Sequence, residues 1–209
     1  MMIRHGLSLL LLLAMLISPV AARAQSAGSV IRVQGQAEAV ESAGVRVLSA
    51  GDPIRPGDRL RTGVAARLLV RFSDGMELTL SDGAEMVVED YSWMPSRGDG
   101  KAVLYLARGA FLLETGQVGK LPDHPLVVRT PVASVGVRGT RFWGGPLDAL
   151  LNVLLLEGRV VVTSPAGSVN LDEPGSGTGI TAVGAAPMPP SFWGEDRILR
   201  AVATVSFAP

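Results

Sequence analysis

The side chain with the most chemical interest is Arg138, which lies between two glycines in the segment Val135-Gly136-Val137-Arg138-Gly139-Thr140. β-branched residues at strand spacing lead into this arginine, and no ordinary turn requires it. A guanidinium at a place where glycines let another backbone approach can clamp a carboxylate or a chain terminus bidentately. Arg138, Gly139 and Thr140 are therefore the candidate binding residues. The alternative is a buried structural arginine that pairs with an internal acid such as Glu157, with Thr140 bonding locally.

Other side chains that could do chemistry are few. The chain has no cysteine and only two histidines, His5 and His124, whereas a zinc site usually needs three or four such ligands. His124 lies in a Pro-Asp-His-Pro sequence typical of a solvated loop, and no Gly-x-Ser-x-Gly elbow accompanies it. Asp74, Asp82 and Asp99 each precede a glycine, so Asp-Gly turns explain them without calcium or a catalytic carboxylate pair. We predict no catalytic residue, no metal site and no cofactor, and hence not an enzyme.

Residues 1–24 have the features of a secretory signal peptide. An apolar run from Gly6 to Val20 follows a basic start, and Ala22-Arg23-Ala24 places small residues at the two cleavage-specifying positions. A signal anchor is the alternative, but a membrane helix needs about 20 apolar residues and this run is shorter. We expect cleavage after Ala24, a periplasmic or secreted bacterial protein, and no integral membrane segment after cleavage.

Charge and length bound the remaining possibilities. Loss of Arg4 and Arg23 with the signal peptide leaves 17 basic residues against 19 acidic ones. This balance gives no electrostatic attraction to nucleic acid, so we expect no nucleic-acid partner. Roughly 185 mature residues make one domain the default, and such a chain can bury around 70% of its unfolded surface.

Short runs rich in Val and Leu dominate the chain, and each is bounded by Gly, Pro, Asp or Ser. This spacing predicts an all-β domain of many short strands, either a rolled two-layer β-sandwich or a short β-solenoid. The runs that we expect as strands are 29–33, 45–48, 67–72, 77–80, 86–88, 103–106, 111–113, 126–129, 150–156 and 159–163.

Two internal echoes support stacked β layers. The sequence Phe-Ser-Asp-Gly-Met-Glu-Leu at 72–78 recurs as Leu-Ser-Asp-Gly-Ala-Glu-Met at 80–86, which places Asp-Gly turns at a fixed interval. Segments 104–113 and 154–162 share the order strand, charged residue, glycine, strand. We expect the chain to fold back or to form a bulge at each of these glycines.

The C-terminal part of the chain changes in character. Prolines and glycines crowd residues 165–190 and disfavour long strands, so we divide the mature chain into a domain at 25–186 and a Pro-rich linker and tail at 187–209. Residues 191–202 predict one short amphipathic helix, with acidic residues in the first turn and arginines later. We expect this helix to dock Trp193 and Leu199 onto the β domain as a cap. A partner-binding tail is the alternative.

Four motifs, in their order along the chain, resemble the FecR-type domain, the periplasmic sensor domain of the ferric-citrate signalling family. They are Gly57-Asp58 with Thr62-Gly63, Phe72-Ser73-Asp74-Gly75, the Val-Gly-Val-Arg-Gly-Thr segment at 135–140, and Leu156-Glu157-Gly158-Arg159-Val160. The resemblance spans about residues 28–185. Any one motif alone would be weak, and the combination makes the resemblance specific.

The resemblance implies a sensor-type module. In the family's signalling proteins a cytoplasmic segment engages a sigma factor, a transmembrane helix follows, and the periplasmic domain receives a signal from an outer-membrane transporter. We expect this chain to be a stand-alone secreted form that makes no direct sigma-factor contact, since a secreted chain cannot reach a cytoplasmic partner. No ligand set for ferric citrate is visible in the sequence.

Three functions follow from these observations. The first is a non-catalytic periplasmic binding or signalling module of FecR type, which recognises another envelope protein through a sheet edge or an apolar groove. The second is an envelope scaffold that binds peptidoglycan or surface polysaccharide. The third is a glycan-active enzyme, which the lack of a recognisable catalytic constellation disfavours.

Overall fold

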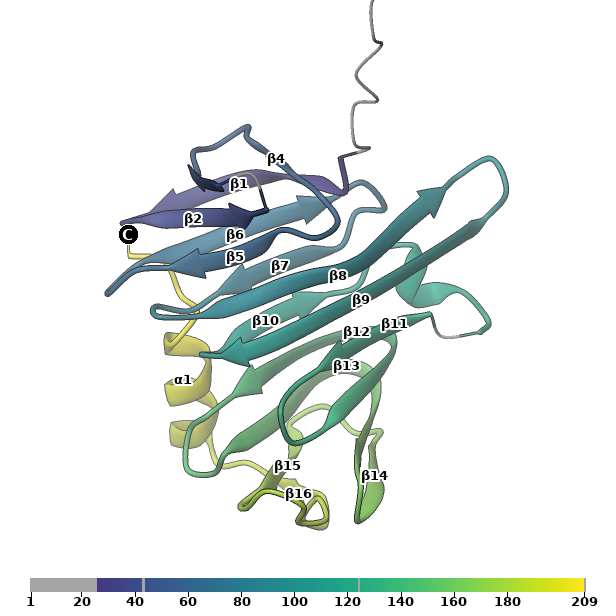
Figure 1. Ribbon diagram of the computed structural model, residues 1–209. Helices are drawn as coiled ribbons and strands as arrows, with labels where there is room; N and C mark the ends of the chain where they lie inside the picture. Colours follow the sequence, from purple (N-terminus) through teal and green to yellow (C-terminus); the bar gives the residue numbers. More distant parts are fainter. Residues whose placement is uncertain (1–25, 43, 124, 209) are drawn as a thin grey trace, which may run out of the picture.

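The computed structural model describes residues 26–42, 44–123 and 125–208. The predicted signal peptide and His124 lie outside the described residues, so both expectations stay predictions. Over the described part the chain is all-β, as predicted, with one α-helix near its C-terminal end (Figure 1). Within these described ranges, no helix has the length and apolar character of a membrane-spanning segment.

The strands are β1 (Gly28–Gln34), β2 (Ala37–Glu41), β3 (Gly44–Val47), β4 (Pro53–Ile54), β5 (Arg59–Thr62), β6 (Arg67–Phe72), β7 (Glu77–Leu80), β8 (Glu85–Met94), β9 (Asp99–Arg108), β10 (Phe111–Glu114), β11 (Leu126–Arg129), β12 (Ser134–Gly145), β13 (Leu151–Ser164), β14 (Gly167–Leu171), β15 (Ser176–Ile180) and β16 (Ser191–Phe192). The helices are the 3-10 turn η1 (Val118–Lys120) and α1 (Glu195–Ala203).

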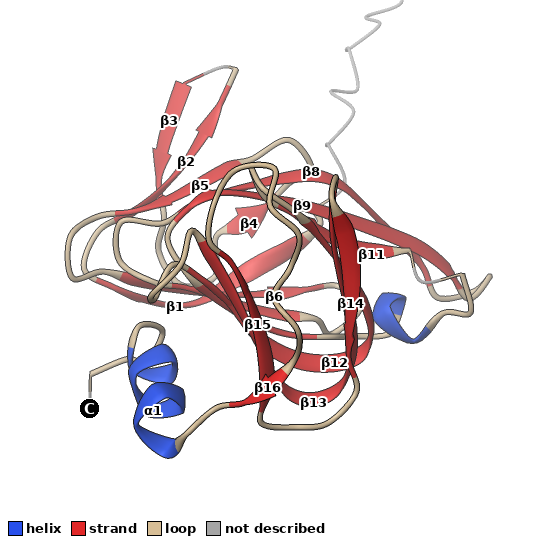
Figure 2. Cartoon of the chain, turned by 90° about the horizontal axis from the view of Figure 1, so that it is seen from below, coloured by secondary structure: helices blue, strands red, loops and turns tan. Residues whose placement is uncertain are grey.

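All of these strands belong to one curled sheet whose main order is β3-β2-β5-β8-β9-β11-β12-β10-β7-β6-β1-β4. The long strand β12 joins two arms, because its first half pairs with β11 and its second half pairs with β10 along the same edge. Its other edge pairs with β13, which carries β14 and β15. Figure 2 shows the two arms curling around a common interior.

The rolled sheet, and not the solenoid, is the alternative that the structure adopts. The strand pairs are antiparallel except for β9 with β11, whereas the coils of a β-solenoid stack in parallel. Alternate residues of both arms meet in one hydrophobic core. Its largest fully buried side chains include Phe72, Phe111, Phe142, Leu60, Leu78 and Leu104.

The Asp-Gly turns are confirmed at two of the three predicted places. Gly75 and Gly83 have φ of 89° and 58°, the left-handed region that glycine enters without steric cost. The third prediction is wrong, because Asp99 begins β9 and the hairpin turns at Gly98, with φ of 58°. Asp74 also anchors the fold, since its carboxylate accepts hydrogen bonds from the N–H of Met76 at 3.1 Å and of Val118 at 3.0 Å.

The second echo marks a fold-back and a bulge. At Gly109, with φ of 83°, the chain passes from β9 in one arm to β10 in the other. At Gly158, with φ of 81°, the predicted strands 150–156 and 159–163 continue as the single strand β13. The glycines in the two echoes therefore serve different geometries.

The C-terminal helix forms where predicted and packs on the outside of the curl (Figure 1). Trp193, just before α1, is 6% exposed and meets Trp143 edge to face at 6.2 Å between ring centroids. The expectation that Leu199 docks is wrong, because 58% of this residue is exposed. Ala201 and Val205 lie in the small hydrophobic cluster beside the two tryptophans instead.

Candidate functional site

The segment that carries Arg138 forms a bulge between β12 and β13. The pairing runs from Arg138 with Arg159 to Arg141 with Glu157, so the register shifts between these pairs. Gly139 has φ of 56°, and a Cβ on Gly158 would overlap the Gly139 carbonyl oxygen. The backbone therefore favours glycine at position 139 and requires it at position 158.

Thr140 holds this bulge from the inside. The residue is 3% exposed, and its Oγ1 lies 2.8 Å from the carbonyl oxygen of Arg138 and 2.7 Å from that of Arg159. The same oxygen accepts a hydrogen bond from the Arg159 N–H at 3.2 Å. The hydroxyl thus links the two strands where the regular ladder is interrupted, which is the local bonding expected of Thr140.

Arg138 points outward from the bulge, and the interpretation of a buried structural arginine is wrong. Its side chain is exposed. Glu157, the expected internal partner, is exposed too and lies 3.9 Å from Arg141. Among the described residues no hydrogen bond or ion pair engages the Arg138 guanidinium. The bulge therefore presents an unpaired cation to solvent.

A groove of about 510 Å³ lies beside this cation on the outer face of β12, β13 and β14. Two rows of paired residues cross the strands here. One row is Arg138 and Arg159, and the other is Gly136, Val161 and Asn170. The lining residues are Gly136, Val137, Arg138, Arg159, Val161, Asn170 and Asp172. We call this hollow the outer-face groove.

Charge in the outer-face groove is unevenly balanced. The Arg159 guanidinium forms an ion pair with the Asp172 carboxylate, so these two charges offset each other. Arg138 has no such partner in the groove, and one positive charge remains. The floor of the groove beside Arg138 and Arg159 is apolar, because Gly136 has no side chain and 38% of Val161 is exposed.

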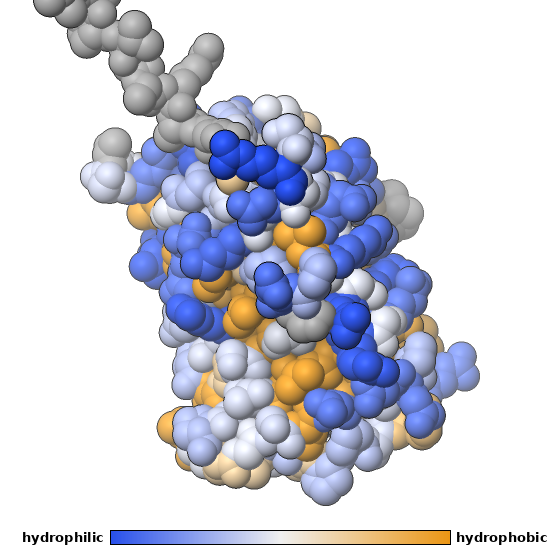
Figure 3. All heavy atoms as spheres, turned by 90° about the vertical axis from the view of Figure 1, so that its right-hand side faces the viewer, coloured by the Kyte–Doolittle hydropathy of each residue, from blue (hydrophilic) through white to orange (hydrophobic). Residues whose placement is uncertain are grey.

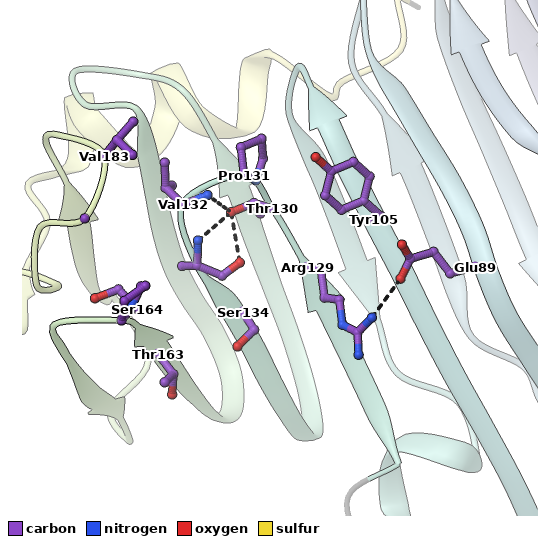
Figure 4. A pocket seen from close by; sticks show the side chains of 13 residues that line it. Glu89, Tyr105, Arg129, Thr130, Pro131, Val132, Ser134, Thr163, Ser164 and Val183 are labelled. Atoms are coloured by element: carbon purple, nitrogen blue, oxygen red, sulfur yellow. Dashed lines mark hydrogen bonds and ion pairs between the residues drawn. The ribbon is translucent and has the colours of Figure 1, made fainter.

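A second hollow of about 630 Å³ adjoins this face at the turn between β11 and β12 (Figure 4). Ser134 and Thr163 form the next cross-strand pair on the same face after Gly136 and Val161, and both line this hollow. At its other side the Arg129 guanidinium donates to Glu89 at 3.2 Å. Figure 3 shows a hydrophobic patch near the middle of the lower part of this side of the molecule, with more hydrophilic residues beside it.

The acidic groups whose pKa values are shifted lie outside the outer-face groove and form hydrogen bonds with other residues of the domain. A hydrogen bond from Arg59, helped by Arg61 and Arg108, lowers the pKa of Glu85. Burial raises the pKa of Asp58, whose carboxylate accepts from Arg46 at 3.0 Å and from the Arg55 N–H at 2.9 Å. Burial raises the pKa of Tyr91 to about 12. None of these groups lines the outer-face groove.

The part of the chain that the structure describes contains no cluster of side chains that could bind a metal ion. There, no three His, Asp or Glu side chains gather closely enough to hold an ion. Asp52 and Asp58, like Asp74, accept backbone N–H bonds from residues two or three positions away along the chain. The aspartates thus act as turn residues there.

Comparison with known proteins identifies the family. The model of the family described as FecR protein matches residues 58–161. This chain carries a FecR domain. The match is narrower than the resemblance over about 28–185 that the motifs indicated, and it takes in Arg138, Gly139, Thr140 and Gly158. A search of curated proteins found no significant match.

Solved structures share the fold of this FecR domain protein. Two crystal structures of a "putative anti-sigma factor" from Parabacteroides distasonis ATCC 8503, at 1.65 and 2.50 Å resolution, align with TM-scores of 0.51 and 0.54. Both are 17% identical in sequence, and each alignment covers 68% of this chain and 62% of the other. At this identity the similarity concerns the fold alone. The chain spans less than two thirds of the length of these proteins.

The FecR match contains part of the outer-face groove. Gly136, Arg138, Arg159 and Val161 lie inside the matched residues, whereas Asn170 and Asp172 on β14 lie beyond them. Sequence reasoning selected Arg138 but missed Arg159, although Arg159 follows the glycine of the second echo. Asn170 and Asp172 carried no signal, because only the pairing of β14 with β13 brings them to the groove.

Proposed function

We propose that this FecR domain protein is a non-catalytic signalling module that binds another protein of the bacterial envelope. The observation that carries the proposal is the unpaired Arg138 guanidinium beside the outer-face groove. Gly139, Gly158 and Thr140 shape the bulge that presents it. A fold that fixes an exposed cation next to a hollow suits recognition of a partner with complementary charge.

The groove supports this function better than the sheet edges do. Among the described strands, β3, β4, β14 and β16 pair on one side only. They are two to five residues long, and short edge strands offer few unpaired backbone groups to an added strand. The groove offers a charge and an apolar floor together, which is the combination found at specific binding sites.

The scaffold that binds wall glycan is the weaker candidate. The lining of the outer-face groove is aliphatic, charged and, at Asn170, polar, with no aromatic ring among its seven residues. A flat sugar ring therefore has no aromatic face in the groove on which to stack. An extended polypeptide needs only small apolar contacts and paired charges, and these are present.

The envelope location rests on the predicted signal peptide and on the FecR domain. Export and cleavage after Ala24 would place the domain in the periplasm or outside the cell. Mass spectrometry of the protein purified from the bacterial envelope would give a mature chain that begins at Gln25. Recovery of the protein with residues 1–24 attached would contradict this part of the proposal.

Capture of the partner tests the function. The tagged full-length chain is expressed in its own host, the envelope is crosslinked, and the captured proteins are identified. Arg138→Ala should lose the partner while its melting temperature stays within about 1 °C of the parent, because an exposed unpaired side chain contributes little to stability. Arg97→Ala is the matched control, since Arg97 is also exposed and has no ion pair among the described residues.

Two results would overturn the proposal. The first is equal capture by the parent and by Arg138→Ala, which would show that the cation does not contact the partner. The second is recovery of the chain with wall fragments alone, which would favour the glycan-binding scaffold.

A further inference from the structure

We propose that Gly136 sets the specificity of the outer-face groove, by keeping its floor open for an extended acidic segment of the partner polypeptide. The inference rests on the proposed function and names the chemistry that the groove recognises. A carboxylate of that segment pairs with Arg138, and its neighbouring backbone and small aliphatic groups lie over Gly136 and Val161.

The fold does not require glycine at position 136. The φ of Gly136 lies outside the left-handed region, so any residue could adopt its backbone conformation. A Cβ built there would meet only the carbonyl oxygen of Val161, at the ordinary contact distance of 3.9 Å. Gly139 and Gly158 differ, because both have a positive φ and a Cβ on Gly158 would overlap the Gly139 carbonyl oxygen.

A side chain at position 136 would be expected to stabilise strand β12. Glycine inside a strand lacks packing surface and loses more backbone entropy on folding than other residues. Gly136 pairs with Val161, and a β-branched residue opposite a valine is a favourable cross-strand pair. The local rules for strand stability thus oppose the residue that is present, and conflicts of this kind are expected at functional sites.

The absence of a side chain at Gly136 leaves the outer-face groove open at this point. Residues 136 and 138 are two apart on β12, so a side chain at 136 would stand on the same face as the Arg138 guanidinium. It would occupy the space between that guanidinium and the hydroxyl-bearing pair Ser134 and Thr163. The open floor therefore lets a ligand reach the cation from along the groove.

The groove selects a carboxylate within a peptide for three reasons. Arg138 has no acid partner among the described residues, while Asp172 already neutralises Arg159. The exposed Asn170 amide at the far side can donate to and accept from a peptide bond. The exposed part of Val161 favours a small aliphatic group between these two polar ends.

Peptide titration followed by amide NMR tests the inference. The folded chain, labelled with 15N, receives the hexapeptide acetyl-Ala-Val-Gly-Glu-Gly-Ala-amide or the same peptide with Gln in place of Glu. We expect the Glu peptide to shift the amide signals of β12, β13 and β14 with a millimolar Kd, since one exposed ion pair contributes little affinity. The Gln peptide should bind at least fivefold more weakly.

The variant Gly136→Val separates specificity from stability. It should raise the melting temperature by about 2 °C through β-propensity and cross-strand packing. It should also reduce affinity for the Glu peptide at least tenfold, because the added side chain fills the groove. Thr79→Val, on β7 in the opposite arm, is the control that introduces a valine into a strand away from the groove.

The outcomes distinguish this inference from the proposed function. Loss of the cellular partner in Arg138→Ala together with full peptide binding by Gly136→Val would leave the proposed function standing and overturn the role of Gly136. Equal binding of the Glu and Gln peptides, or equal shifts with an N-acetylglucosamine trimer, would overturn the acidic-peptide chemistry. Loss of stability in Gly136→Val would show that the glycine serves the fold.

Discussion

Replacement of Thr140 by valine removes the hydroxyl that holds the bulge and keeps the shape of the side chain. Oγ1 contacts two carbonyl oxygens at 2.7 and 2.8 Å and accepts the Arg159 N–H at 3.2 Å, all at a residue that is 3% exposed. Valine would leave these part-buried backbone groups without that partner, which costs about 2 kcal/mol. For a chain of this size, this lowers the melting temperature by roughly 4–8 °C.

Thermal unfolding followed by tryptophan fluorescence or circular dichroism measures this loss. Thr140→Ser is the matched control, because it keeps the hydroxyl and loses one methyl group, which costs about 1 kcal/mol. The valine variant should therefore melt below the serine variant. A valine variant that melts within 1 °C of the parent, or above the serine variant, would refute the claim that the hydroxyl holds the bulge.

Two further predictions concern the backbone of the bulge and the charges outside the groove. Gly158→Ala should lower the free energy of unfolding by about 3 kcal/mol or prevent folding, because a Cβ on this residue would meet the Gly139 carbonyl oxygen and φ is 81°. A decrease below about 1 kcal/mol in a urea titration would contradict this geometry. Glu85, whose pKa is lowered in the folded state from the ordinary value of 4.5, stabilises the protein above that value, and this stability is lost as the pH falls through the folded pKa. Glu85→Gln should therefore lose less stability than the parent when urea unfolding is measured at successively lower pH below 4.5, and equal losses would show that the Arg59 contact does not stabilise the carboxylate.

Local sequence rules predicted the parts of the fold that local chemistry determines. The strands β6, β7 and β11 begin and end where hydrophobic alternation and flanking turn residues predicted. The strands β2 and β5 were missed, because Ala, Glu and Arg have weak strand preference and these segments become strands through pairing with their neighbours. Pairing between distant segments is a tertiary effect that no local window contains.

The site shows the same division between local and tertiary information. The second echo correctly indicated a bulge at Gly158. Regular alternation up to Arg138, with Val135 and Val137 buried, already places this arginine on the outer face, whereas the register shift that follows it could not be predicted from local rules. Val137 and Thr140 point into the protein, while Arg138 points out. The expected pairing with Glu157 failed because the register shift places Glu157 opposite Arg141.

Site-specific photocrosslinking tests most directly the central claim that the outer-face groove is the surface that binds a partner. A photoreactive amino acid replaces Asn170 in the groove, or Thr79 on β7 as the control, and the cells are irradiated. The account predicts one discrete protein adduct from position 170, none from position 79, and loss of the adduct when Arg138→Ala is added. Equal adducts from both positions, or an adduct at position 170 that persists in Arg138→Ala, would contradict it.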